Sequence, residues 1–152
     1  MNYSKRLQEA ADAKDLDKFI STYVEACENS SDLGDKAAYL LSDMGSKAVE
    51  EVAKMLNTNT KSEDFRSYVA NCLVRAISLK PGIGNSKVTK YELIRAVESA
   101  STNTEYFISD NAQHALVLIG VKEISGVPIA EYYLNLKDRR LEEDMKNLLG
   151  GL

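Results

Sequence analysis

The stretch "AAYLLSDMG", residues 37–45, has a counterpart in "AQHALVLIG", residues 112–120. In both stretches an alanine is followed eight positions later by a glycine, and the residues between them are mainly apolar. Glycine readily adopts the left-handed conformation that ends many helices. Each stretch therefore predicts a helix that ends at its glycine. A third, less regular copy begins at Ala70 and has Ser78 in the glycine position.

Amphipathic helices are expected along nearly the whole chain. Apolar residues recur at the i, i+3, i+4 spacing of a helix, and no segment shows the sustained alternation of a strand. The sequence therefore predicts an all-α protein of about nine helices, with no strand, in a single domain that spans residues 1–152. Ser46 and Ser62 are expected to cap helices, and Thr89 with Glu92 has the spacing of a capping box.

The last two of these helices are expected after residue 127. Pro128 suits the first turn of a helix that continues through "IAEYYLNLK", residues 129–137. The closing helix has an apolar stripe, and we expect this stripe to cover the last hairpin or, alternatively, to form a dimer contact. The stripe consists of Leu141, Met145, Leu148 and Leu149.

The three related stretches define a repeat. Ala37, Ala70 and Ala112 each begin a unit of two helices, at offsets of 33 and 42 residues. This pattern resembles HEAT-type helical repeats, in particular the short Ala/Leu/Gly-rich kind that is also found in bilin-lyase-like proteins. The resemblance implies a short HEAT-like α-solenoid of antiparallel helical hairpins. The unequal offsets and Ser78 leave an irregular compact helical bundle as the alternative.

Composition narrows the class of protein. The chain has 19 basic and 23 acidic residues, a net charge of −4, which disfavours a general nucleic-acid binder. The N-terminus has no apolar signal segment, and no apolar run approaches the ~20 residues that span a bilayer. Cys27 and Cys72 lie in apolar stripes, which fits reduced thiols. We therefore expect a cytoplasmic protein.

Few residues suggest chemistry. His114 is the only histidine, and Asp110 lies one helical turn before it. With one histidine and two distant cysteines, a metal site is not expected. The segment "GIGNSK", residues 82–87, lacks the spacing of a phosphate-binding loop. The sequence therefore predicts no catalytic residue, no metal and no cofactor.

Two groups of residues are candidates for contact surfaces. In HEAT-like arrays the second helix of each hairpin lines the concave face, so the resemblance implies a protein-binding surface there. Its candidate residues are Glu50, Glu51, Lys54, Arg95, Glu98, Glu131 and Tyr132. Residues 58–100 also have seven basic against four acidic side chains. Lys80, Lys87 and Lys90 in this basic segment, residues 61–95, are candidates for contacts with an anion or with nucleic acid.

The tyrosines are divided between packing and contact. Tyr23, Tyr39, Tyr68, Tyr91 and Tyr133 lie on or beside apolar stripes, so we expect them to pack in the interior. Tyr132 cannot point in the same direction as its neighbour on a helix, so one of the two is expected to be exposed. An exposed tyrosine is a common anchor for a protein partner.

The leading hypothesis is a non-enzymatic protein-binding module. A specific form of it is a small acidic inhibitor or immunity protein that neutralises a basic toxin such as a nuclease. The alternative is a nucleic-acid-binding helical-repeat protein that uses the basic segment. A lyase-like enzyme, which the resemblance to bilin-lyase-like repeats makes conceivable, is the second alternative.

Overall fold

The computed structural model describes residues 2–58, 61–100 and 106–129, and these residues are mostly helical. Within them the prediction of an all-α fold is confirmed. The described part contains seven α-helices rather than nine, and the two helices expected after residue 127 lie, from residue 130 on, outside the described residues. The seven helices are α1 (Tyr3–Asp12), α2 (Leu16–Glu28), α3 (Gly34–Met44), α4 (Ser46–Lys54), α5 (Glu63–Leu79), α6 (Lys87–Ala100) and α7 (Tyr106–Leu118).

Two short 3₁₀ turns and a small hairpin complete the described elements. The turn η1 (Met55–Asn57) follows α4, and η2 (Pro81–Gly84) joins α5 to α6. Strands β1 (Glu123–Ile124) and β2 (Val127–Pro128) pair in an antiparallel register in which Ile124 faces Val127.

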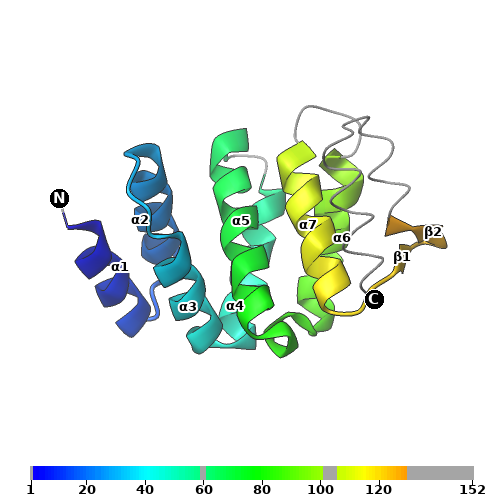
Figure 1. Cartoon of the computed structure of the whole chain (residues 1–152), viewed down its shortest axis with the longest axis horizontal. Coiled ribbons are helices and arrows are strands. Elements are labelled where there is room, and N and C mark those ends of the chain that lie inside the picture. The colour runs from blue at the N-terminus through cyan, green and yellow to red at the C-terminus, as the bar shows by residue number, and fades with distance from the viewer. Residues whose placement is uncertain (1, 59–60, 101–105, 130–152) are drawn as a thin grey trace.

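The helices stand in two layers (Figure 1). In the first layer α3 packs on α5 and α5 packs on α7, while α1 contacts α3. In the second layer α2 contacts α4 and α4 contacts α6. The turns that follow α3, α5 and α7 all lie at the lower edge of the view in Figure 1. The molecule therefore has two outer faces, one for each layer, and a common edge of turns.

The core lies between the two layers. Apolar side chains at helical spacing point inward from both, as the sequence pattern predicts. Phe19 on α2, Leu41 on α3 and Val52 on α4 are fully buried, and so are Leu73 on α5 and Leu116 on α7. Burial of such side chains is the main favourable term in folding.

The repeated helix ending is confirmed. Gly45 has a φ of 92° and Gly120 a φ of 87°, both in the region that side chains disfavour. Ala37, Ala70 and Ala112, which begin the three related stretches, are all buried. Gly45 alone separates α3 from α4, so these two helices turn back on each other within one residue.

The helix caps agree with the sequence only in part. The hydroxyl of Ser62 accepts a hydrogen bond from the N–H of Phe65 at 3.1 Å, so this cap is confirmed. Ser46, in contrast, is the first residue of α4, and Gly45 occupies the cap position without a side-chain hydrogen bond. At the start of α6 the Ser86 hydroxyl accepts from the N–H of Thr89 at 3.1 Å, which replaces the predicted Thr89 cap.

Within the residues that the structure describes, the expectation of no strand is wrong at the hairpin. Ser125 and Gly126 have φ values of 52° and 81°. Two successive residues with positive φ form the tight turn that favours a two-stranded hairpin. Pro128 consequently lies in β2 and not in the first turn of a helix, and Ile124 anchors the hairpin because its side chain is buried.

Candidate functional site

A groove crosses the outer face of the first layer. It has a volume of about 630 Å³ and lies over α5, between α3 and α7. Much of its wall is apolar, and its lining residues are Asp35, Ala38, Tyr39, Val74, Arg75, Ser78, Leu79, His114 and Leu118. We call this hollow the α5 groove. A pocket with apolar walls and a few convergent polar groups is typical of a binding site.

Large apolar side chains are exposed around the α5 groove. Tyr39 is 62% exposed and Leu79 is 56% exposed, and both line it. Phe107 on α7 is 53% exposed and lines a neighbouring hollow of about 350 Å³. Exposed apolar side chains that gather in one place often mark a contact surface.

Arg75 lies between the two hollows and lines both of them. Its Nη1 is 3.6 Å from Oδ1 of Asp35, and both side chains are substantially exposed. The guanidinium also lies against the backbone of Gly34, where there is no side chain to displace it. An exposed pair at this distance contributes little to stability, so Arg75 can exchange its partner for a group on a ligand.

Among the described residues that line the groove, His114 has a carboxylate next to it on its own helix, that of Asp110, which is buried behind the groove wall and is not part of it. Nε2 of His114 lies 3.5 Å from Oδ1 of Asp110, one turn earlier on α7. Asp110 is buried, whereas His114 is partly exposed to the groove. Ser78 lines the same groove, but within the described residues it makes no hydrogen bond to His114. The geometry therefore shows a carboxylate beside a histidine, without an aligned nucleophile.

The two cysteines are poor nucleophiles. Burial raises the pKa of the Cys72 thiol to about 12. Burial also raises the pKa of Cys27, which shares a hydrogen bond with Tyr23. Both thiols therefore remain protonated at neutral pH. Because the thiolate is the reactive form of a cysteine, neither is a good nucleophile. Burial raises the pKa of Tyr23 as well, so this hydroxyl also stays neutral.

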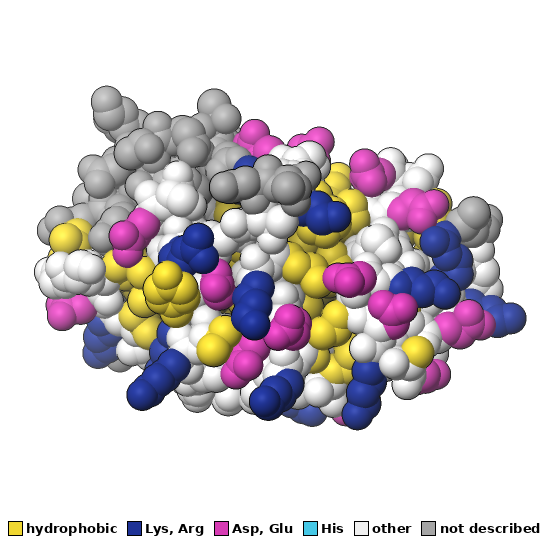
Figure 2. All heavy atoms as spheres, turned by 180° about the vertical axis from the view of Figure 1, so that it is seen from behind, with side chains coloured by type: hydrophobic (Ala, Val, Ile, Leu, Met, Phe, Trp, Pro, Cys, Tyr) yellow, Lys and Arg dark blue, Asp and Glu magenta, His cyan; other side chains and the backbone are white. Residues whose placement is uncertain are grey.

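The structure brings most of the sequence-predicted protein-binding residues together on the second layer. Glu50, Glu51 and Lys54 lie on α4, and Arg95 and Glu98 lie on the adjacent α6. All except Glu50 are exposed, and Glu50 is half-buried. Figure 2, which shows the molecule from behind, displays charges of both signs interspersed with apolar side chains. Glu131 and Tyr132 lie outside the described residues.

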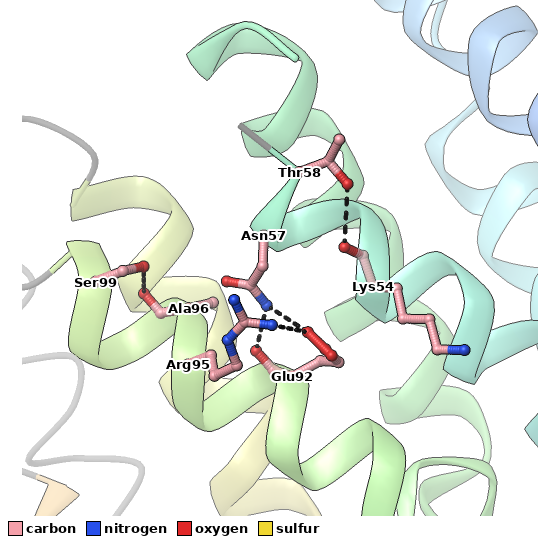
Figure 3. A network of polar contacts seen from close by, with 7 residues as sticks. All are labelled: Lys54, Asn57, Thr58, Glu92, Arg95, Ala96 and Ser99. Atoms are coloured by element: carbon pink, nitrogen blue, oxygen red, sulfur yellow. Dashed lines mark hydrogen bonds and ion pairs between the residues drawn. The ribbon is translucent and has the colours of Figure 1, made fainter. Parts of the chain in front are cut away.

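Part of this second-layer surface is held in a polar network (Figure 3). Nδ2 of Asn57 donates to the main-chain oxygen and to Oε1 of Glu92, both at 2.9 Å. Nη1 of Arg95 lies 3.2 Å from the same Oε1. Lys54 bonds to Glu51 at 3.0 Å, and this hydrogen bond raises the pKa of Lys54. Glu92 is buried, so the network ties η1 to α6 as well as presenting charge.

The three candidate anion contacts lie near the edge of turns. Lys80 follows α5, and its Nζ is 3.9 Å from Oδ1 of Asp43. Lys87 and Lys90 lie in the first turn of α6, where Lys87 is exposed and Lys90 is half-buried. They are separate from the α5 groove, which includes none of the three.

Two tyrosines that were expected to pack in the interior are exposed. Tyr39 lines the α5 groove, and Tyr91 on α6 is 59% exposed beneath the guanidinium of Arg95. Tyr23, in contrast, is buried as predicted. The spacing of Tyr39 and Tyr91 beside the apolar stripes does not show on which side of the stripe each ring emerges.

Neither a metal site nor a membrane span is found within the described residues. These residues contain no cluster of three or more histidine, cysteine or carboxylate side chains that could hold a metal ion. None of their helices has the length and apolar character needed to cross a membrane.

Comparisons with protein-family models, curated proteins and solved structures each gave no match.

Proposed function

We propose that this protein is a non-enzymatic helical-repeat module that binds another protein through the α5 groove. The groove supplies apolar surface at its centre and charged groups at its rim. Interfaces are commonly built in this way, with an apolar centre and a polar border. In this proposal His114 is a polar part of the groove wall, and the buried Asp110 lies beside it.

A short HEAT-like solenoid of helical hairpins is the architecture that we propose for the module. Two features support it: the helices stand in two layers, and Ala37, Ala70 and Ala112 take equivalent buried positions on α3, α5 and α7. In such an array each hairpin buries one face on its neighbour, which leaves extended outer faces for binding.

The exposure of Tyr39, Leu79 and Phe107 around Arg75 is the observation that carries the proposal. A monomeric protein gains stability by burying such side chains, yet here Tyr39 and Leu79 line the α5 groove and Phe107 lines the neighbouring hollow, with Arg75 lining both. Tyrosine and arginine are also the residue types that most often dominate the binding energy of an interface. The groove therefore offers both the apolar area and the anchors that a partner needs.

A basic partner fits this surface best. Asp35 lines the groove and Asp32 lines the neighbouring hollow, and both are exposed. A partner segment with apolar side chains for the groove and basic side chains beside them would complement this rim. Together with the net charge of −4, this supports the more specific proposal of an inhibitor or immunity protein that covers a basic toxin.

The test is affinity capture with the tagged full chain from lysate of the source organism, after nuclease treatment. Tyr39→Ser/Leu79→Ser removes the groove anchors, and Val88→Ser/Tyr91→Ser is the matched control on α6. All four side chains are exposed, so both variants are expected to fold, which thermal melts would check. We expect a protein that the wild type and the control retain and that the groove variant loses.

Other outcomes have defined meanings. Loss of the partner only in the Val88→Ser/Tyr91→Ser variant would assign the contact surface to α4 and α6, where the resemblance to HEAT-like repeats predicts it. Equal retention by all three proteins would also exclude the groove. If the wild type retains no protein at all, the proposal of a protein-binding module is wrong.

A further inference from the structure

Three turns meet at one edge of the molecule. They are the α3–α4 turn at Gly45, the α5–α6 turn that contains η2, and the turn after α7 at Gly120, all at the lower edge of Figure 1. The Lys80 contact with Asp43 joins the first two. The side chain of Ile119 lies beside Gly84, where an added Cβ would come within 3.1 Å of its Cγ2, and this joins the second turn to the third.

This edge is basic. Over residues 43–47, 79–90 and 119–123 there are five lysines against two acidic residues, Asp43 and Glu123. We call these lysines the basic edge: Lys47, Lys80, Lys87, Lys90 and Lys122. Four of the five are exposed and Lys90 is half-buried. In Figure 2 basic side chains follow one another along the lower margin of the molecule.

Most of the basic edge is not neutralised by the protein itself. Asp43 is the acidic neighbour of Lys80, at 3.9 Å between exposed groups. Among the residues that the structure describes, Lys47, Lys87, Lys90 and Lys122 have no acidic partner within ion-pair distance. These four charges therefore remain available to an external anion.

The positions of these lysines do not favour helix stability. Lys47 lies in the first turn of α4, and Lys87 and Lys90 lie in the first turn of α6. Neither first turn contains an acidic residue, as in α1 and α7 and unlike α2, α3 and α5. The start of a helix carries partial positive charge and favours acidic side chains. Lysines there raise the local positive potential instead of balancing it.

We propose that the basic edge binds the phosphate backbone of a nucleic acid, independently of sequence. Lysines recur on successive turns along a row, so they can follow a linear chain of negative charges. Exposed Ser46 and Asn85 add hydrogen-bond donors between the lysines, and such side chains commonly contact phosphate oxygens. The net charge of the whole chain does not prevent this, because a local patch decides the local potential.

The basic edge covers only part of the lower margin. The α1–α2 turn also lies there in Figure 1, but it contains three aspartates, Asp12, Asp15 and Asp17, and two lysines. The bound strand is therefore expected to follow the turns from α3 to β1 and to end before α1. This surface is separate from the α5 groove and does not depend on the protein-binding proposal.

The test measures binding of fluorescein-labelled 20-mers, one a DNA duplex and one a single-stranded RNA, by fluorescence anisotropy between 25 and 200 mM salt. The test variant is Lys47→Glu/Lys87→Glu, with one change in the first turn of each helix. The matched control is Lys5→Glu/Lys18→Glu, which changes the net charge equally at exposed positions outside both the basic edge and the basic segment. The groove variant Tyr39→Ser/Leu79→Ser is measured in parallel.

We expect the wild type to bind both oligonucleotides, with affinity that falls as salt rises. Each lysine–phosphate contact contributes about 0.7 to 0.9 to the slope of log affinity against log salt. The test variant should therefore bind at least about 25-fold more weakly at 0.1 M salt and show a slope that is shallower by about 1.4 or more. The control and the groove variant should match the wild type.

Helix electrostatics makes this variant a clean test. Glutamate in the first turn of α4 and α6 interacts favourably with the helix dipole. The thermal midpoint of the Lys47→Glu/Lys87→Glu variant should therefore equal or exceed that of the wild type. Loss of binding could then not come from unfolding.

Absence of oligonucleotide binding at 25 mM salt, or equal weakening by the control, would overturn the proposal. Binding to vesicles with 30% phosphatidylserine but to neither oligonucleotide would overturn it too, in favour of a membrane surface.

Discussion

The guanidinium of Arg75 lies directly against the backbone of Gly34, at a point that a side chain on Gly34 would occupy. Gly34 is the first residue of α3, and Asp35, which pairs with Arg75, is the next. The start of α3 thus holds the one basic side chain that lines both hollows of the first layer. Because Gly34 on α3 has no side chain, the guanidinium of Arg75 on α5 can lie at this point.

Gly34→Ala should move Arg75 without unfolding the protein. The new methyl group would overlap Nη1, which is the far end of a flexible side chain. We expect the thermal midpoint to change by less than about 2 °C. Capture of a groove partner should weaken, because Arg75 would lose its position beside Asp35. Circular dichroism melts and capture yields measure the two effects.

Gly82→Ala is the matched control for this change. A Cβ on Gly82 would have open space around it, and the φ of Gly82 is not in the positive range that side chains disfavour. Both its stability and its partner capture should equal those of the wild type. If Gly34→Ala also captures the partner as well as the wild type does, the position of Arg75 does not matter for binding.

Gly45→Ala should destabilise the protein by about 1–3 kcal/mol, the usual cost of a strained backbone conformation. Gly45 has a φ of 92° and a ψ of −175°, a conformation that is essentially restricted to glycine. No nearby atom obstructs the new methyl group, so the cost comes from the backbone alone. Urea unfolding of Gly45→Ala beside Gly82→Ala measures it. Equal midpoints would show that the turn can relax into another conformation.

The sequence predicted those features of the fold that depend on short-range pattern. The apolar stripes predict the helices. Gly45 and Gly120 predict two helix endings, because a residue with positive φ at the end of a helix is usually glycine. Ser46 was assigned wrongly as a cap because Gly45 alone makes the turn, so Ser46 is already helical. The hairpin at Ser125 and Gly126 was missed because each strand has only two residues, too few to show alternation.

The α5 groove could not be predicted in the same way. It depends on how far apart α3 and α7 stand over α5, and helical periodicity carries no information on that distance. Tyr39 illustrates the problem, because its spacing fits either the edge of the buried stripe or the exposed rim. The basic segment was visible in the sequence, but its lysines become one surface only when three turns meet at one edge.

Asn57→Ala should destabilise the protein by about 1–3 kcal/mol, because it removes the donor that satisfies a buried acceptor. Asn57 bonds both to the main-chain oxygen and to the carboxylate of Glu92. Thr58→Ala is the control, since the exposed Thr58 hydroxyl makes only a 3.3 Å bond to the Lys54 carbonyl. Chemical unfolding of both variants compares the two losses.

A double-mutant cycle with Glu92→Ala isolates the side-chain part of the Asn57–Glu92 contact, because it removes the Oε1 acceptor. Residues that share a network are expected to show an interaction energy of about 0.5–3 kcal/mol. Strict additivity would contradict the network in Figure 3. Because Arg95 bonds to the same Glu92 oxygen, changes at Arg95 should also be checked for stability before they are interpreted as binding effects.

Stability should fall above pH 9, partly because of Cys72. Burial holds the pKa of this thiol at about 12 in the folded protein, against 9.0 when it is exposed. Between these values the unfolded chain binds fewer protons than the folded chain, so the free energy of unfolding decreases as pH rises. The contribution is up to about 1.4 kcal/mol per pH unit. Buried Tyr23, whose pKa is also raised by burial, adds to the loss in the same direction.

Cys72→Ala tests this assignment. Its free energy of unfolding should be lower than that of the wild type at pH 7, because a buried side chain is shortened. Between pH 9 and 11 it should decline less steeply, because one ionisable group is absent. Urea titrations at several pH values give both quantities. Parallel pH profiles would show that Cys72 does not contribute to alkaline unfolding.

The one-residue turn at Gly45 and the row of helices also determine how the chain folds. Among the seven described helices, those with extensive mutual contacts are at most three apart in chain order, so these contacts have short sequence separation. Low contact order of this kind is associated with folding in milliseconds or less, on the order of other helical proteins. Loss of structure should begin at α1, which contacts α2 and α3 extensively but no other described helix. Amide hydrogens of α5, which packs against helices on both sides, should then exchange last.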